Sequence, residues 1–258
     1  REAGGEFKKM LNKYENYYHQ IENKHWWHIS RRDMIIKLIQ WEGLDKNYRV
    51  LDIGCSTGKL VKELLKLSKA TVFGIDISET AIKQCKKDGL ENIHLMSGDK
   101  TAFDDNSFDL IIASDCLEHI ENDTQALIEW KRILKDNGKL IIFVPAWKTL
   151  WSSLDEISHH HRRYSFSDLK IKLINTDFNI HRISFWNAVL FIPIFIYRKI
   201  ENLNRANNVM RDQSSLPSNF INELLKSILK FENKIIKKYN CPIGVSLFAI
   251  CTKNNYEN

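Results

Sequence analysis

A ten-residue stretch, residues 50–59, constrains the fold more than any other part of this chain. It reads Val-Leu-Asp-Ile-Gly-Cys-Ser-Thr-Gly-Lys, so an apolar run enters a turn with glycine at 54 and 58 and leads into a helical pattern. Glycine lets a ligand approach the backbone, and the first amides of a helix face that ligand, with Asp52 as an acceptor beside them. The stretch predicts a strand, a turn and a helix that hold a nucleotide-like cofactor.

The same turn departs from the dinucleotide-binding fingerprint. Gly-x-Gly-x-x-Gly would need glycine at 54, 56 and 59, where this chain has Gly54, Ser56 and Lys59. A nicotinamide-dependent oxidoreductase is therefore the less favoured alternative.

Further apolar runs with strand character alternate with helical patterns. We expect strands at 71–75, 93–96, 108–113 and 140–144, and helices at 60–67, 79–87 and 124–134. This alternation is typical of a parallel sheet that helices cover on both faces, and ligands of such sheets bind at the carboxyl ends of the strands. Polar segments follow the expected strands at these ends, namely Asp76, residues 97–99 and residues 114–120.

Residues 48–145 resemble the core of the class I S-adenosylmethionine-dependent methyltransferases. The resemblance rests on Asp52-x-Gly54-x-x-x-Gly58, on Asp76, on Asp99 and on Leu-Glu-His at 117–119, which is typical of a broad small-molecule subgroup. It implies a doubly wound, mostly parallel seven-stranded α/β sheet of Rossmann-like type, with S-adenosylmethionine as the cofactor. Such enzymes usually finish with an antiparallel pair, and 178–185 and 245–252 both have strand character. A helical insertion then separates the last two strands.

The resemblance also implies which residues bind the cofactor. Asp52, Gly54, Cys55 and Gly58 would surround the methionine part of the cofactor, and Asp76 would accept from its ribose hydroxyls. Ile77 and Asp99 would contact the adenine, the latter as an acceptor from the adenine amine, and Ser114 and Asp115 would line the methionine end. Two alternatives stay open. Asp76 could cap the helix that begins near Ser78, and Asp99 could be an ordinary turn residue.

An aromatic segment precedes the expected core. It contains Tyr14, Tyr17, Tyr18, His25, Trp26, Trp27 and His28, followed by Arg31, Arg32 and a helical pattern at 33–41. In the resembling enzymes such a segment often folds over the cofactor. Trp27 and Arg31 are therefore candidates to cover the cofactor and to bind its carboxylate, and the alternative is that these aromatic residues pack against the edge of the sheet.

A second polar segment, residues 147–164, contains three consecutive histidines. Adjacent side chains point in different directions, whereas metal ligands are usually two or four residues apart, so we expect no metal site from these three. Histidine can remove a proton near neutral pH, which makes His119, His159, His160 and His161 candidates for a general base. For His119 a structural role stays open. The expected acceptor-binding residues are Glu118, Trp151, Asp155, Arg162 and Tyr164.

The positive charge of the chain is concentrated in its last third. Residues 181–258 contain 11 Lys and Arg against 5 Asp and Glu, whereas residues 1–180 contain 27 of each. The apolar run at 185–197 is shorter than the roughly 20 residues that cross a bilayer. At 220–239 a helical pattern carries eight apolar residues that we expect to face the core: Ile221, Leu224, Leu225, Ile228, Leu229, Phe231, Ile235 and Ile236. The alternatives are a lid over the site and a patch that contacts a membrane surface.

These patterns divide the chain into five expected parts. Residues 1–7 are expected to be a cloning remnant, 8–47 a helical and aromatic cover, 48–185 the cofactor-binding core, 186–241 the insertion, and 242–258 the last strand and tail. Five cysteines without a Cys-x-x-Cys pair favour a reducing compartment, and no secretory signal is visible, so we expect a cytoplasmic protein with a membrane-surface contact through 185–199 as an option.

The function that the sequence predicts is methyl transfer from S-adenosylmethionine to a small or amphipathic acceptor, for example a lipid-linked or glycan molecule. A non-catalytic cofactor-binding protein is the second hypothesis, and the oxidoreductase is the third. We expect no nucleic-acid partner, because the basic residues lie among aliphatic ones and no nucleic-acid-binding module is recognisable.

Overall fold

The computed structural model describes residues 17, 19–43, 47–67, 69–203 and 216–253. The expected remnant at 1–7, together with Tyr14 and Tyr18, lies outside the described residues. The elements follow in the order α2 (Trp26–Trp41), β1 (Arg49–Ile53), α3 (Lys59–Leu67), β2 (Thr71–Asp76), α4 (Glu79–Lys87), β3 (Ile93–Leu95), β4 (Phe108–Ser114), η1 (Leu117–His119), α5 (Asp123–Ile133), β5 (Leu134–Pro145), η2 (Lys148–Leu150), α6 (Ser153–Ile157), α7 (Phe166–Asn175), β6 (Phe178–Trp186), α8 (Phe191–Leu203), α9 (Asn219–Ile236) and β7 (Ser246–Lys253).

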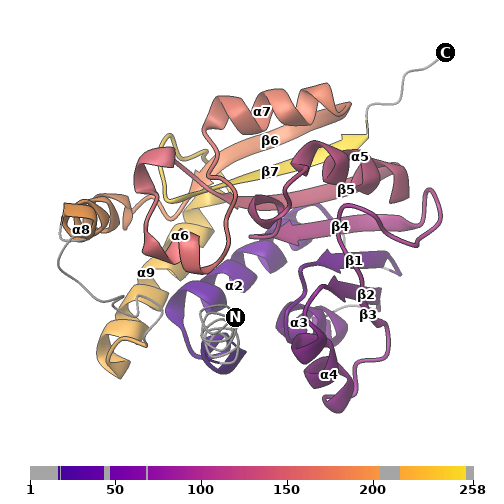
Figure 1. The fold of residues 1–258 in the computed structure, drawn as a ribbon, viewed down its shortest axis with the longest axis horizontal. Helices are drawn as coiled ribbons and strands as arrows, with labels where there is room; N and C mark the ends of the chain where they lie inside the picture. Colours follow the sequence, from indigo (N-terminus) through magenta and orange to yellow (C-terminus); the bar gives the residue numbers. More distant parts are fainter. Residues whose placement is uncertain (1–16, 18, 44–46, 68, 204–215, 254–258) are drawn as a thin grey trace, which may run out of the picture.

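One seven-stranded sheet forms the centre of the molecule, with strand order β3-β2-β1-β4-β5-β7-β6 (Figure 1). Strand β1 pairs in parallel with both β2 and β4, and β7 pairs antiparallel with both β5 and β6. The chain order reverses between β1 and β4, which creates the crevice where ligands of open α/β sheets bind. The predicted fold class, including the antiparallel last pair and the helical insertion before β7, is confirmed.

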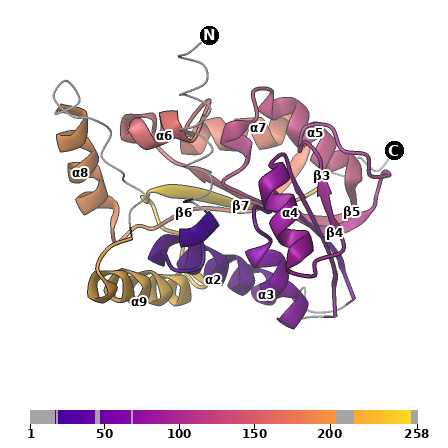
Figure 2. The ribbon, with the colours of Figure 1, turned by 60° about the horizontal axis from the view of Figure 1, so that its bottom comes forward.

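Helices cover both faces of the sheet, as Figure 2 shows. On one face, Val50, Leu110 and Ile141 pack with α2, α3, α4 and α9. On the other face, Leu51 and Ile111 pack with α5 and α7. Neighbouring residues of one strand therefore enter opposite cores, because side chains alternate along a strand and both faces are buried.

The helix before the first strand begins earlier than the sequence pattern indicates. We expected it at 33–41, but α2 begins at Trp26, because the side chain of His25 accepts from the backbone amide of Trp27 and serves as its N-cap. Histidine is not among the preferred N-cap residues, so the sequence gives little sign of this start. The extra two turns bring Trp27 and Arg31 into the same helix.

The insertion between β6 and β7 forms two helices, α8 and α9, at one end of the sheet (Figures 1 and 2). Pro193 lies in the first turn of α8, where its missing N–H costs nothing, so it does not interrupt the helix. Within the described residues, no helix combines the length and apolarity that crossing a membrane requires.

The buried face of α9 is not the one that its sequence pattern predicts. Leu229 and Ile236 are buried as expected, but the other buried residues are polar: Asn222, Glu232 and Asn233. Asn233 donates to the Ser30 carbonyl on α2, and Glu232 accepts from the backbone amides of Ala188 and Val189. Four of the eight apolar residues that we expected to face the core are therefore exposed, namely Ile221, Leu224, Phe231 and Ile235, and Phe220 beside them is exposed as well.

Candidate functional site

The glycine turn after β1 lies at the carboxyl edge of the sheet, beside the crevice between β1 and β4. Gly54 and Gly58 have φ angles of 75° and 71°, in the left-handed region that favours glycine. A Cβ on Gly54 would lie 3.1 Å from the Cβ of Cys116, and one on Gly58 would lie 2.4 Å from Leu90. Both glycines are thus required by close packing of the protein itself, and not only by the approach of a ligand.

Asp76, at the end of β2, is tied to this turn. Its carboxylate accepts from the backbone amide of Ser56 at 2.8 Å and from that of Ser78 at 2.9 Å. The N-cap of α4 is Ser78, whose side chain accepts from Ala81, so the capping alternative for Asp76 does not describe its geometry. Asp76 links the ends of β1 and β2 at the position predicted for a ribose.

Two further carboxyl groups reach the same turn. Asp52 on β1 is buried, and Glu22, from the segment before α2, accepts from the Thr57 hydroxyl at 2.7 Å and from that of Ser56 at 3.3 Å. Burial, and then the negative charges of Glu22 and Asp76, raise the pKa of Asp52 well above its usual range. The turn therefore concentrates negative charge, which favours a positively charged ligand group.

Arg31 lies among aromatic rings near the end of β4. Its guanidinium carbon lies 4.3 Å from the ring centres of Phe143 and Trp186 and 4.6 Å from that of Trp27. It donates to the Ser246 hydroxyl at 2.8 Å and pairs with Asp115 at 3.1 Å. Trp27 itself packs edge-on against Trp186. The structure thus places both predicted cover residues against the sheet edge, with Arg31 binding Asp115.

The other predicted cofactor residues differ in their surroundings. Ile77 is 74% exposed, as expected of a residue that awaits a ligand. Asp99 accepts from Ser97, which suits a turn residue as well as an adenine ligand. Ser114 donates to Asp115 at 3.0 Å. Cys55 is buried, and its amide donates to the Ile75 carbonyl, so its backbone and side chain are engaged within the protein.

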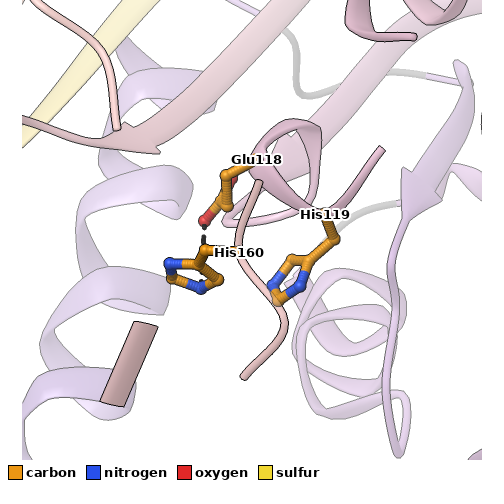
Figure 3. A group of neighbouring side chains, drawn as sticks. All are labelled: Glu118, His119 and His160. Atoms are coloured by element: carbon orange, nitrogen blue, oxygen red, sulfur yellow. Dashed lines mark ion pairs between the residues drawn. The ribbon is translucent and has the colours of Figure 1, made fainter. Parts of the chain in front are cut away.

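Glu118, His119 and His160 meet at the mouth of the crevice (Figure 3). Glu118 is fully buried, and neither of its carboxylate oxygens has a hydrogen-bond partner among the described residues. The nearest His160 nitrogen, Nε2, lies 4.0 Å from Glu118 Oε1. Burial and the charge of Asp115 raise the pKa of Glu118 well above its usual range, and burial and His160 lower the pKa of His119 to about 4.

Asp155 fixes the orientation of His160. Its Oδ1 lies 2.8 Å from His160 Nδ1 and accepts from Arg163 at 2.7 Å, while Oδ2 accepts from Ser152 and from Arg198 of the insertion at 3.2 Å. Although burial opposes it, His160 and Arg163 hold the pKa of Asp155 well below its usual range. An ionised carboxylate only accepts, so Nδ1 carries the proton and Nε2 keeps its lone pair.

The remaining predicted site residues do not join this group. His159 and His161 are exposed, as expected for neighbours that point in different directions. Arg162 pairs with Asp123 at 2.7 Å, and the buried Tyr164 donates to the same carboxylate at 2.8 Å. Trp151 donates weakly to Glu156 at 3.3 Å. Arg162 and Tyr164 both bind Asp123, and their acceptor-binding roles stay predictions.

Three residues that the sequence analysis did not select belong to this region. Glu22 contacts the glycine turn, Arg198 contacts Asp155, and Asn187 is buried at the same edge of the sheet with no hydrogen-bond partner on its side-chain amide among the described residues. The capping box Ser152-x-x-Asp155 is a sequence signal for the position of Asp155. Glu22 and Asn187 have no comparable local signal, because their partners come from distant segments.

The comparisons with known proteins agree with this geometry. Residues 51–142 match the family model of a methyltransferase domain. Demethylmenaquinone methyltransferase of Staphylococcus aureus is 33% identical over 114 residues, which are 42% of this chain and 47% of that protein. Sterol 24-C-methyltransferase ERG6B of Gibberella zeae is 32% identical over 103 residues, which are 37% of this chain and 27% of that protein. The matches therefore span about half or less of these relatives' length.

Among solved structures, phosphoethanolamine N-methyltransferase 2 of Haemonchus contortus, in complex with S-adenosyl-L-methionine, has the same fold. Its TM-score is 0.58 at 18% identity, and the alignment covers 86% of this chain and 52% of that one. This likeness confirms the predicted fold, and the family model identifies residues 51–142 as a methyltransferase domain. The comparisons do not reach the assignment of individual site residues, which stay predictions.

Proposed function

We propose that this protein transfers a methyl group from S-adenosylmethionine to a small or amphipathic acceptor. The observation that carries the proposal is the convergence of Asp52, Asp76 and Glu22 on the glycine turn, inside a domain that matches methyltransferases. S-adenosylmethionine has a sulfonium and an ammonium group near its methionine end, and a cluster of carboxyl groups favours both charges. A ribose diol can donate to a carboxylate in the position of Asp76.

The protein itself has little part in the making and breaking of bonds during methyl transfer. S-adenosylmethionine supplies an activated methyl group when it is bound, and an acceptor lone pair attacks the methyl carbon as the carbon–sulfur bond breaks. The protein must align the two reactants and exclude water, which is worth an effective concentration of roughly 10⁵ M or more. Asp115 and Glu118, which follow β4, are suited to line the acceptor end because β4 borders the crevice. We also propose that the chain belongs to the small-molecule subgroup in which Leu-Glu-His follows the fourth strand.

An amphipathic acceptor is favoured by the surface of the insertion. Ile192, Ile196 and Ile200 recur every four residues on α8 and are exposed, so they form one apolar stripe along the helix. Phe220, Leu224, Phe231 and Ile235 form a similar exposed stripe on α9. Exposed apolar area of this extent marks an interaction surface. The quinone and sterol named for the two relatives are also apolar acceptors.

The partner proposed for these stripes is an anionic membrane surface. Lys234 follows Phe231 by three residues, so an exposed cation and exposed apolar side chains share one side of α9. Apolar side chains enter the boundary between head groups and acyl chains, and each nearby lysine contributes about 1 kcal/mol with acidic lipids. Arg198 connects this surface to Asp155 and thereby to the site.

Calorimetric titration with S-adenosylmethionine and S-adenosylhomocysteine tests the proposed function. We expect micromolar binding by the chain and no binding of NAD, which serves as the control ligand. Binding of NAD in place of S-adenosylmethionine, or of neither, would contradict the proposal. Cofactor binding without methyl transfer to any of a panel of quinone, sterol and lipid-linked acceptors would favour a non-catalytic protein.

Vesicle co-sedimentation tests the membrane contact separately. We expect binding to vesicles that contain phosphatidylglycerol, weaker binding at high salt because the lysines are screened, and loss of binding in a Phe231→Ser and Ile235→Ser double variant. The matched control is Ile171→Ser, which removes an exposed apolar side chain from α7 on the opposite face of the sheet. Equal binding by the double variant and the control would overturn the membrane contact.

A further inference from the structure

The buried carboxyl group of Glu118 lacks hydrogen-bond partners among the described residues. The residue has no exposed surface, and this lack extends to both carboxylate oxygens. Burying an unpaired carboxyl group costs several kcal/mol, so buried acids in proteins are paired, hydrogen-bonded or bound to metal. Something other than the protein's own described side chains is required to complete the surroundings of Glu118.

Two imidazole rings are placed next to these oxygens. His119 follows Glu118 in η1, and His160 comes from the segment after α6, 42 residues along the chain from Glu118. The two rings lie 4.6 Å apart at an angle of 85°, and one donor atom of each of the three residues lies within 4.8 Å of the other two. Figure 3 shows the His160 ring next to the Glu118 carboxylate, with the His119 ring beside that of His160.

The hydrogen bond to Asp155 prepares His160 as a ligand. Because Nδ1 donates to Asp155 at 2.8 Å, the lone pair lies on Nε2, which is the nitrogen nearer to Glu118. Metal-bound histidines almost always donate their second nitrogen to a carboxylate or carbonyl in this way, and the arrangement makes the ring a stronger ligand. Asp155 is itself fixed by Arg163 and Arg198.

Positive charge on the nearby arginines would repel a metal ion, but carboxylates balance it. Arg31 pairs with Asp115 at 3.1 Å, and Arg163 and Arg198 both pair with Asp155. Two carboxylates, Asp115 and Asp155, therefore face three arginines, and the charge of Glu201, which acts on Arg198, supplies the third negative charge. The charge of an ionised Glu118 is thus available to an added cation.

We propose that Glu118, His119 and His160 bind one divalent transition-metal ion. Two imidazole nitrogens and one carboxylate are the ligands of many zinc sites and of sites for other first-row metals that keep open positions. The donor atoms lie within 4.8 Å of one another, and each would have to come within 2.0–2.2 Å of a bound zinc ion. His159 and His161 take no part, so only one of the three consecutive histidines is a ligand.

The chemical use of the ion rests on the proposed function, whereas its binding does not. An open coordination position at the acceptor mouth suits a hydroxyl or enolic oxygen, and a bound metal ion lowers the pKa of such an oxygen. The proton is then released to solvent, and the oxygen or its conjugated carbon carries the lone pair that attacks the methyl group. The ion would take the place of a histidine as the group that activates the acceptor.

Metal binding by the full chain tests the proposal directly. The protein is treated with a chelator, dialysed, and titrated by calorimetry with Zn²⁺ and, separately, with Mn²⁺, while elemental analysis counts bound ions. We expect one ion per chain, and an affinity at least 100-fold weaker in Glu118→Gln and in His160→Ala. The matched control is His161→Ala, which removes the exposed neighbour of His160 and should bind the ion as the wild type does.

Two results would overturn the metal site. One is the absence of saturable binding by the wild type, and the other is unchanged affinity in both Glu118→Gln and His160→Ala. Calorimetry of Glu118→Gln with S-adenosylmethionine separates this failure from failure of the proposed function, because the cofactor affinity should persist. Metal binding without cofactor binding would leave the metal site standing and sink the methyltransferase.

Discussion

Glu118 and Asp123 are two buried carboxyl groups five residues apart, both after β4, and their surroundings are opposite. Asp123 accepts from Tyr164, Lys172 and Arg162 at 2.7–2.8 Å. Burial alone would raise its pKa, but these hydrogen bonds hold the pKa below its usual value. Glu118 has none of these partners, and its pKa is raised. The difference separates a carboxylate that stabilises the fold from one whose surroundings a ligand completes.

The largest expected effect comes from removing the satisfied carboxylate. Asp123→Ala should lower the free energy of unfolding by about 3–5 kcal/mol, because the Tyr164 hydroxyl and two cations lose their partner. Glu118→Gln should change it by less than about 1 kcal/mol, since no hydrogen bond is lost. Urea denaturation followed by circular dichroism measures both. Equal destabilisation by the two variants would contradict the difference between Asp123 and Glu118.

Asp76 sharpens the comparison, because its carboxylate has backbone partners and yet is expected to bind a ligand. Asp76→Ala should weaken S-adenosylmethionine binding by about 10- to 100-fold, the effect of losing hydrogen bonds to a charged group. Asp99→Ala is the control and should have a smaller effect, since the predicted contact of Asp99 is to the adenine amine alone. Calorimetry of both variants gives the answer, and a greater loss in Asp99→Ala would refute the ribose assignment.

A smaller effect is expected from pH. A carboxyl group whose folded pKa is lowered contributes stability that is present above its unfolded pKa and lost as the pH falls through the folded pKa. The stabilising contribution of Asp123 should therefore be complete above about pH 5 and should shrink below about pH 4. Urea denaturation of the wild type and Asp123→Asn as a function of pH should show a difference that narrows in acid. A difference that grows in acid would contradict the assignment.

The smallest effect concerns Ile77, which is exposed and packs on little within the protein. Ile77→Ala should leave the free energy of unfolding unchanged within about 0.5 kcal/mol, while weakening cofactor binding about fivefold, through loss of roughly 1 kcal/mol of apolar contact with adenine. Leu67→Ala, at the end of α3, is the matched exposed control and should change neither quantity. Unchanged cofactor affinity in Ile77→Ala would mean that adenine binds elsewhere.

Most of the fold followed from local patterns. The buried runs that became β1, β2, β4 and β5 are apolar on both faces, and the positions of β2 and β4 were predicted closely, whereas β5 begins at Leu134, well before the expected start at 140. The doubly wound, mostly parallel type of the sheet, with its antiparallel last pair, followed from the family resemblance. The outward face of α9 was mispredicted, because Asn222, Glu232 and Asn233 find buried partners that no helical period shows.

The candidate site was only partly predictable, for the same reason. The residues of the glycine turn are close together in sequence, and so are those of the segment after β4. The two segments meet in space because they follow the ends of adjacent parallel strands. The choice of His160 among three histidines depends instead on Asp155, which Arg198 of the insertion holds in place. Such long-range pairing has no local sequence signal, and neither has the contact of Glu22 with Thr57.

The position of β7 has a consequence for synthesis of the chain. This strand, although it is the last in sequence, lies between β5 and β6 and hydrogen-bonds to both, and Ser246 at its start accepts from Arg31 next to the candidate site. During translation, β6 cannot join the sheet and Arg31 cannot reach its final position until residues 246–253 have left the ribosome. Pairings of such high sequence separation form late in folding. A nascent chain would therefore complete the surroundings of Arg31 only after residues 246–253 have emerged.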